Sequence, residues 1–338
     1  MIDPAYPASE ASGIWVFLEH DNGQLAPVSL ELAAKARELS RQSGARLTGL
    51  LLGSGMVVPR QNAERLDLDE LLVVSNPFLD EFTAEGYSYA AAEVIRDRKP
   101  DILLLGATAY GRDLAGRLAV MLRTGLTADC TALELEPGTG LLLGEVSGFG
   151  GGILATIKCE VHRPQMATVR PGVFAAPEQP VAGNPEVVPL NVDIPMSSCP
   201  VRVVGRKIGS GVDISRAERL VVAGRGAAND LPSIQSLARL LNAEIGATRV
   251  AVDEGWATRE QQVGQTGIIT RPKLAVVFGA SGASQFTVGI EQAGLVVALN
   301  QDPEAPIFEQ ADLCVVDDLV PVLRALVAEF ESNGGGAQ

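Results

Sequence analysis

Residues 274–284 read LAVVFGASGAS, five apolar residues followed directly by a turn of small residues. The apolar run Leu274–Phe278 has the length and composition of a strand buried on both faces. The turn at 279–284 brings backbone amides to the start of a helix, where the helix dipole favours an anion such as phosphate. Its glycines are three residues apart, so it differs from the GxGxxG fingerprint, and tight strand-to-helix packing explains such a turn equally well.

The surrounding sequence repeats this alternation of strand and helix. In the second half we predict further strands at Arg219–Ala223, 295–299 and Leu313–Val316, and helices at 231–241 and from residue 317 onward. Several of these strands end in small or polar residues, and in open α/β sheets ligands bind beyond the carboxyl ends of the strands. The pattern predicts a doubly wound sheet with a ligand at that edge.

The first half shows the same pattern. We predict strands at 14–18, 47–52, 71–74 and 101–105, and helices at 30–41, 87–97 and 112–123. Such alternation is typical of a mostly parallel sheet with helices on both faces. The fold class predicted for the chain is therefore α/β, with two domains of this kind.

A proline-rich stretch separates the two halves. Seven prolines fall between Pro171 and Pro200, and proline fixes φ and lacks a backbone donor, which suits a linker or an edge strand better than a helix. We predict an N-terminal α/β domain at 1–175, a linker at 176–202 and a C-terminal domain at 203–338.

Composition excludes several classes of function. The net charge of -14 makes nucleic acid a poor partner. No apolar stretch is long enough to cross a bilayer, and residues 1–13 resemble neither a signal nor a transit peptide, so we expect a cytoplasmic protein. The four cysteines form no CxxC pair and there are only two histidines, so we expect no metal site and no disulfide framework. Redox chemistry would need a cofactor.

Two features of the second half suit a cofactor. Arg225 lies between two glycines, where it would neutralise a pyrophosphate or simply be a surface cation. Residues 262–267 read QVGQTG and are dense in glycine and amides, without helical or strand periodicity. Uncharged donors and acceptors of this kind suit a heterocycle such as isoalloxazine, although a plain surface loop has the same composition.

Read together, the segments 246–255, 263–267, 281–285 and 300–308 resemble the FAD domain of electron-transfer flavoprotein α subunits over residues 219–326. The most specific segment is NQDPEAPIF at 300–308. Segments 111–115, 125–130 and 163–172 resemble the same family in the first half, so the resemblance extends over nearly the whole chain after residue 13.

The resemblance implies FAD as the cofactor and assigns its contacts. Arg249 would lie against the flavin ring, the Thr266 hydroxyl near flavin N5, and residues 281–285 at the pyrophosphate and ribityl chain. Asn300 and residues 318–319 would hold the adenosine end. The full set is Arg225, Thr248, Arg249, Val263, Gly264, Gln265, Thr266, Ser281, Gly282, Ala283, Ser284, Gln285, Phe286, Asn300, Asp318 and Leu319.

Phe286 departs from the family pattern. The family often has a histidine after its SGxxQ motif, where it would hydrogen-bond the flavin O2 region. Phenylalanine fills space but neither donates a hydrogen bond nor carries charge. We expect FAD binding to persist, with Arg249 as the main cation that stabilises the reduced flavin.

The function implied is that of an electron carrier and not of an enzyme. A heterodimer with a β subunit, which the N-terminal domain would face, would take electrons from flavin dehydrogenases such as the acyl-CoA dehydrogenases of fatty acid β-oxidation. It would pass them to a quinone-linked or ferredoxin-linked acceptor. Two alternatives remain: a subunit of an electron-bifurcating, NADH-linked complex with a second FAD in the β subunit, or a flavin-free regulatory nucleotide-binding protein.

Overall fold

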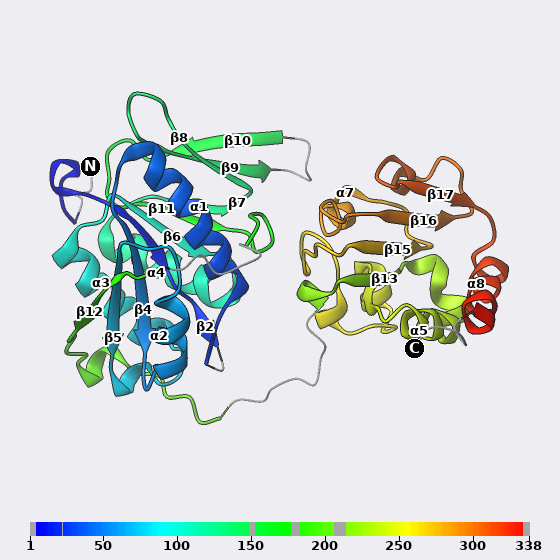
Figure 1. The fold of residues 1–338 in the computed structure, drawn as a ribbon, viewed down its shortest axis with the longest axis horizontal. Helices are drawn as coiled ribbons and strands as arrows, with labels where there is room; N and C mark the ends of the chain where they lie inside the picture. Colours follow the sequence, from blue (N-terminus) through cyan, green and yellow to red (C-terminus); the bar gives the residue numbers. More distant parts are fainter. Residues whose placement is uncertain (1–4, 22, 149–152, 177–182, 206–213, 334–338) are drawn as a thin grey trace. The chain divides into compact units, whose positions relative to one another are not determined.

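The computed structural model describes residues 5–21, 23–148, 153–176, 183–205 and 214–333, and the chain divides into two compact units, Met1–Arg206 and Lys207–Gln338 (Figure 1). Each unit is built around a parallel sheet with its own apolar core. The α/β class predicted from the alternating sequence pattern is confirmed.

The first unit contains a seven-stranded sheet in the order β12-β5-β4-β1-β6-β11-β7, in which every pairing is parallel. Its strands are β1 (Ile14–Phe17), β4 (Leu47–Gly53), β5 (Glu70–Ser75), β6 (Ile102–Gly106), β7 (Leu126–Cys130), β11 (Gln165–Val169) and β12 (Glu186–Leu190). Strand β12 lies in the proline-rich stretch predicted as a linker, where it pairs with β5 at the edge of the sheet.

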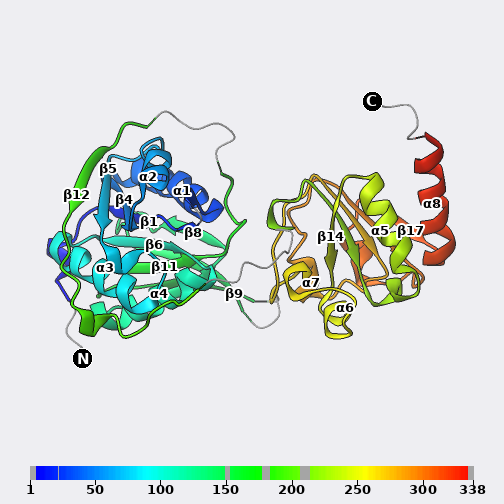
Figure 2. The same ribbon diagram turned by 90° about the horizontal axis from the view of Figure 1, so that it is seen from below.

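Helices cover both faces of this sheet, as Figure 2 shows. The helices are α1 (Pro27–Ser43), α2 (Val57–Ala63), α3 (Ala84–Arg98) and α4 (Ala109–Leu122). Side chains of β1 alternate between the two cores: Trp15 and Phe17 pack with α3 and α4, whereas Ile14 and Val16 pack with α1. This period of two is what a strand covered on both faces requires.

A three-stranded antiparallel sheet, which the sequence patterns did not predict, projects from the first unit. It consists of β8 (Ala132–Leu135), β9 (Leu142–Gly148) and β10 (Ile153–Lys158), and a short hairpin pairs β2 (His20–Asp21) with β3 (Gln24–Leu25). The side chain of Gln165 joins β9 to the parallel sheet, because it accepts from the Leu142 amide at 2.8 Å and donates to Asp101 at 3.3 Å.

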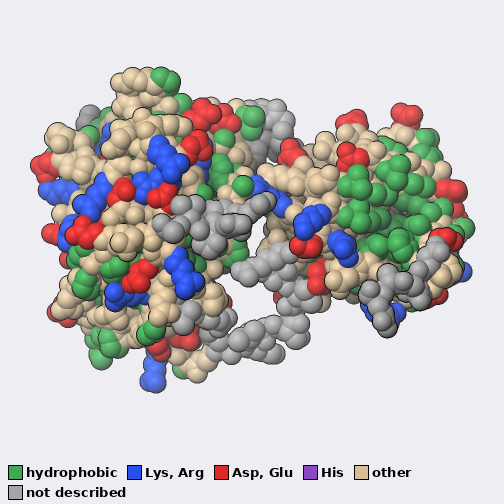
Figure 3. All heavy atoms as spheres, viewed as in Figure 1, with side chains coloured by type: hydrophobic (Ala, Val, Ile, Leu, Met, Phe, Trp, Pro, Cys, Tyr) green, Lys and Arg blue, Asp and Glu red, His purple; other side chains and the backbone are tan. Residues whose placement is uncertain are grey.

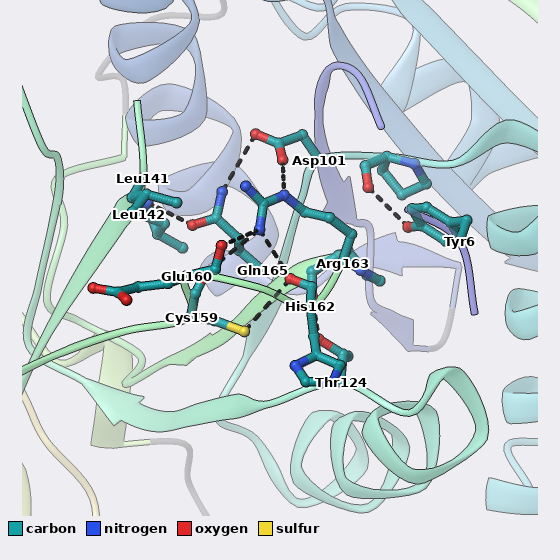
Figure 4. Close-up of polar contacts among 12 residues, drawn as sticks. Tyr6, Asp101, Thr124, Leu141, Leu142, Cys159, Glu160, His162, Arg163 and Gln165 are labelled. Atoms are coloured by element: carbon teal, nitrogen blue, oxygen red, sulfur yellow. Dashed lines mark hydrogen bonds and ion pairs between the residues drawn. The ribbon is translucent and has the colours of Figure 1, made fainter. Parts of the chain in front are cut away.

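Arg163 completes this junction (Figure 4). Its guanidinium is paired with Asp101 and donates to the His162 carbonyl at 3.0 Å. Arg163 is buried, and a buried guanidinium is tolerated only when it is paired and hydrogen-bonded in this way. The segment 163–172, which carries part of the family resemblance, therefore fixes the antiparallel sheet to the core of the first unit.

The second unit is a five-stranded parallel sheet in the order β14-β13-β15-β16-β17. Its strands are β13 (Arg219–Ala223), β14 (Glu244–Ala247), β15 (Leu274–Phe278), β16 (Val296–Asn300) and β17 (Leu313–Val316); its helices are α5 (Leu231–Leu240), α6 (Arg249–Asp253), α7 (Ser284–Thr287) and α8 (Leu319–Asn333). Helices α5 and α8 pack on one core and α7 on the other. The predicted doubly wound arrangement is confirmed.

Counted along the chain, this strand order is 2-1-3-4-5, which reverses between β13 and β15. Chain segments that leave these two neighbouring strands go to opposite faces of the sheet, so a crevice opens beyond their carboxyl ends. The topology alone therefore places the binding edge at the turns after Ala223 and Phe278.

Candidate cofactor-binding site

A cavity of about 740 Å³ lies at this edge of the second unit. It is lined by Arg225, Gly226, Thr248, Arg249, Val250, Gln262, Val263, Thr266, Gly279, Ala280, Ser281, Gly282, Ala283, Gln285, Phe286, Asn300, Asp302, Ala305 and Pro306. These residues follow β13, β14, β15 and β16, so the cavity gathers the carboxyl ends of four parallel strands. Its volume is in the range of small-molecule sites.

Two glycine turns meet at the floor of the crevice. Gly279 adopts φ +64°, and a Cβ added there would lie 2.7 Å from the Cα of Gly226. The Gly226 amide donates to the Gly279 carbonyl at 3.0 Å, and the Gly224 amide donates to the Phe278 carbonyl at 2.8 Å. Glycine is therefore required where the turns after β13 and β15 pack backbone against backbone.

The turn after β15 also contacts the segment that follows β16. A Cβ added to Gly282, which has φ +85°, would lie 2.1 Å from the Ile307 amide nitrogen. The Ile307 amide donates to the Ser281 carbonyl at 3.1 Å, and the Asn300 side chain donates to the Ala280 carbonyl at 2.9 Å. The SGAS turn and the NQDPEAPIF segment thus form one wall of the cavity.

The VGQTG loop docks against the same turn. The Gln265 amide donates to the Gln285 carbonyl at 2.7 Å, and a Cβ on Gly264 would lie 2.4 Å from that carbonyl oxygen. Neither Gly264 nor Gln265 lines the cavity. Their observed role is to hold Val263 and Thr266, which do line it, against the start of α7.

The charged side chains of the lining are Arg225, Arg249 and Asp302, so cations outnumber anions. Arg249 pairs with Asp253 at 3.4 Å, but their side chains are 70% and 60% exposed. An exposed pair of this kind contributes little free energy, so the Arg249 guanidinium is easily redirected to an anionic ligand.

Phe286 contributes an apolar wall. Its side chain is buried and packs in one core with Val263, Ala280 and Ile290, while the residue also lines the cavity. Besides Gly264 and Gln265, three further predicted contacts lie outside the lining: Ser284, which begins α7, and Asp318 and Leu319 at the start of α8. Asp318 accepts from the Val320 amide at 3.1 Å, and the Leu319 side chain is buried in the α5 and α8 core. Their contact with a cofactor stays a prediction.

Sequence reasoning missed several lining residues. These are Gly226, Val250, Gln262, Gly279, Ala280, Asp302, Ala305 and Pro306. Each lies next to a predicted contact or inside one of the motifs, so its position relative to the motifs could have identified it from the sequence. Only Gln262 has an unusual environment: it is 2% exposed, and its Oε1 has no hydrogen-bond partner among the described residues.

These features fit a flavin dinucleotide. The glycine turns after β13 and β15 let phosphates approach backbone amides, the two arginines supply positive charge, and the buried Gln262 oxygen offers an acceptor to a ligand donor. Within the described residues, no group of three or more His, Cys, Asp or Glu side chains is placed to hold a metal ion.

A smaller cavity, of about 270 Å³, lies at the corresponding edge of the first unit. Its carboxylates are Glu19, Asp21, Asp80 and Glu81. Burial raises the pKa of Glu19, although the Thr108 hydroxyl, which donates to it at 2.6 Å, lowers that pKa in part. A lining this acidic repels phosphate, so the second unit is the one that suits a dinucleotide.

Comparison with known proteins finds two matching family models. The family model of the electron transfer flavoprotein domain matches residues 14–195, and that of the electron transfer flavoprotein FAD-binding domain matches residues 213–291. In the part of the chain that the structure describes, no helix is long and apolar enough to cross a membrane.

Similar curated proteins match along most of their length. The electron transfer flavoprotein subunit alpha of Thermoanaerobacterium thermosaccharolyticum is 39% identical over 94% of this chain and 97% of its own. Protein FixB of Rhizobium meliloti is 39% identical over 94% and 92%. The LctC subunit of the lactate dehydrogenase (NAD(+),ferredoxin) of Acetobacterium woodii is 38% identical over 94% and 77%. The chain belongs to the electron transfer flavoprotein α-subunit family.

Proposed function

We propose that this chain binds one FAD in the cavity of its second unit and, with a β subunit, carries electrons from flavin dehydrogenases to a downstream acceptor. The observation that carries the proposal is the convergence of the SGAS, VGQTG and NQDPEAPIF segments on one cavity at the strand-order reversal. The FAD-binding family model covers the SGAS and VGQTG segments and ends at residue 291, before NQDPEAPIF.

The division of labour within the cavity follows from its chemistry. Bound FAD supplies the electron transfer, and the protein supplies binding, orientation and electrostatics. Arg225 and the turn after β15 would hold the phosphates. Arg249 would place a fixed cation near the ring, where positive charge stabilises the electron density gained on reduction and raises the potential.

The cavity suits a carrier better than an enzyme that transforms a substrate. The ionisable side chains of its lining are Arg225, Arg249 and Asp302. Arginine stays protonated and cannot exchange protons near neutral pH, so the lining offers no acid and base pair for a proton-transfer reaction. A ring reached from its exposed edge can still exchange electrons with a partner.

The second unit has an exposed apolar surface. Apolar side chains gather on the face seen in Figure 3, and the exposed apolar residues of this unit include Leu313 and Val316 of edge strand β17 and Phe330 of α8. Exposed apolar patches of this kind mark protein contacts. We propose that this surface, together with the N-terminal domain, contacts the β subunit, and that the heterodimer is cytoplasmic.

The names of similar proteins indicate which donors and acceptors to test. One relative, from Anaerotignum propionicum, is named acryloyl-CoA reductase electron transfer subunit beta and is 34% identical. We therefore propose acyl-CoA dehydrogenases as candidate donors and a quinone-linked or ferredoxin-linked protein as acceptor.

Co-expression with the β subunit from the same genome tests the proposal. We expect yellow heterodimer that releases FAD, and not FMN, on denaturation, at one FAD per α chain, whereas the α chain alone should be flavin-poor or poorly soluble. A colourless heterodimer, or one that releases FMN, would contradict the proposal. A stable α monomer with one FAD bound would show that FAD binding does not require the β subunit.

A second candidate function is a subunit of an electron-bifurcating complex, because the LctC relative belongs to an enzyme named for both NAD(+) and ferredoxin. Two FAD per heterodimer and ferredoxin reduction driven by NADH would support this candidate. One FAD per heterodimer, without NADH oxidation, would support the simple carrier.

A further inference from the structure

The backbone of Gln262 is fixed by two hydrogen bonds and one β-bridge. Its amide donates to the Arg259 carbonyl at 3.1 Å, its carbonyl accepts from the Ile268 amide at 2.7 Å, and it forms an isolated bridge with Ala247 at the end of β14. The residue is 2% exposed and lines the cavity. Its position is therefore set by the fold and does not depend on a bound ligand.

The two ends of the Gln262 side chain have different environments. Nε2 donates to the Thr266 hydroxyl oxygen at 2.8 Å, whereas Oε1 is buried without a hydrogen-bond partner among the described residues. A buried carbonyl oxygen left unpaired costs about 1–3 kcal/mol, so native proteins rarely keep one without a reason. An N–H or O–H of a ligand in the cavity would remove that penalty.

The contact with Nε2 constrains the Thr266 hydroxyl. A hydroxyl has one hydrogen to donate and two lone pairs to accept with. Because the Gln262 side chain already donates to this oxygen, the hydroxyl hydrogen cannot point at Gln262. Thr266 is exposed and lines the cavity, so its hydrogen is available to an acceptor on the ligand.

Thr266 and Gln262 therefore present one donor, the Thr266 hydroxyl, and one acceptor, Gln262 Oε1, to a ligand in the cavity. An oxidised isoalloxazine carries the matching pattern on one edge, with ring nitrogen N5 and a carbonyl oxygen as acceptors next to an N–H donor. A purely accepting edge or a purely donating edge would leave one member of the pair unsatisfied.

We propose that Gln262 is a positioning residue that orients the Thr266 hydroxyl as a donor toward the flavin ring, with its own Oε1 accepting from the ligand. This inference rests on the proposed function, since it requires a flavin in the cavity. Electron density on the ring rises on reduction, so an oriented donor stabilises the reduced ring and raises its potential.

The test uses Gln262→Met in the α/β heterodimer, with FAD removed and then titrated back. Methionine has a similar volume but no donor and no strong acceptor. We expect FAD affinity to fall about tenfold, which corresponds to about 1.4 kcal/mol, and the flavin potential to fall. We expect the thermal midpoint of the FAD-free heterodimer to stay level or rise, because the substitution removes an unpaired buried oxygen.

Two further variants separate positioning from packing. Thr266→Val removes the hydroxyl, and adding Gln262→Met to it should lower the potential no further. The matched control is Gln310→Met at an exposed position outside the cavity, which should change none of these readouts.

The outcomes are distinguishable. A wild-type heterodimer that binds no FAD would overturn the proposed function and this inference together. A wild type that binds FAD, with Gln262→Met unchanged in affinity and potential, would overturn this inference alone. A lower thermal midpoint of the FAD-free Gln262→Met protein, or additive shifts in the double variant, would assign Gln262 a packing role and also overturn it.

Discussion

Gly282→Ala isolates the close approach that builds the cavity wall. Gly282 has φ +85°, which an L-residue adopts at a cost of about 1–2 kcal/mol. The added Cβ would also lie 2.1 Å from the Ile307 amide nitrogen and 2.4 Å from the Ile307 Cα, both backbone atoms. The segment at Ile307 must therefore move, which breaks the 3.1 Å bond from its amide to the Ser281 carbonyl.

Loss of that bond adds about 1 kcal/mol to the backbone strain. We expect the free energy of unfolding of the second unit to fall by about 2–3 kcal/mol. Because Ala305 and Pro306 line the cavity just before Ile307, we also expect FAD affinity to fall by on the order of tenfold or more. Chemical denaturation of the FAD-free heterodimer and FAD titration measure the two effects separately.

Gly255→Ala is the matched control. Gly255 has φ +81°, yet nothing lies within 4 Å of its added Cβ. The free energy of unfolding of Gly255→Ala should therefore fall only by the cost of a positive φ, about 1–2 kcal/mol, and its FAD affinity should not change. Equal destabilisation of the two variants, or unchanged FAD affinity in Gly282→Ala, would refute the close-approach argument.

Three further predictions address charge and pH. Arg249→Ala should lower the flavin potential by about 40 mV for one electron, which corresponds to about 1 kcal/mol for an exposed cation. Arg249→Lys should restore part of this loss. An unchanged potential in a redox titration of Arg249→Ala would show that Arg249 does not stabilise the reduced flavin. Phe286→His should raise the flavin potential, and the increase should grow as the pH falls from about 8 to 6, because histidine gains a proton in that range. Weaker FAD retention without a pH-dependent shift of the potential would instead show that Phe286 only packs the core. Burial raises the pKa of Glu19, so the stability linked to its proton is present at low pH and is lost as the pH rises through that pKa. Glu19→Gln should therefore raise the thermal midpoint near pH 7 but not near pH 4, and Glu134→Gln, at an exposed position, is the control. An equal shift of the midpoint at both pH values would contradict this linkage.

Most of the α/β architecture was predictable because it depends on local pattern. A buried strand such as Leu274–Phe278 must be apolar, and the turn after it needs glycine where φ is positive, so both leave marks in the chain itself. The antiparallel strands β8 to β10 escaped prediction because apolar and polar residues do not alternate strictly in their sequences; β9 reads LLGEVSG and β10 reads ILATIK. For edge strand β12 the sequence left a linker and an edge strand as alternatives, because a proline such as Pro189 suits both.

The sequence by itself determined the family and most of the cavity lining, because motifs such as VGQTG and NQDPEAPIF keep their order and spacing along the chain. Only the tertiary structure decided which members of those motifs face the cavity. Leu319 was a predicted contact, but its side chain is buried in the core between α5 and α8. Gln262 was not predicted, yet among the described residues it carries the one unpaired buried side-chain oxygen of the lining. Burial and hydrogen-bond partnership are set by residues distant in sequence, and no local pattern encodes them.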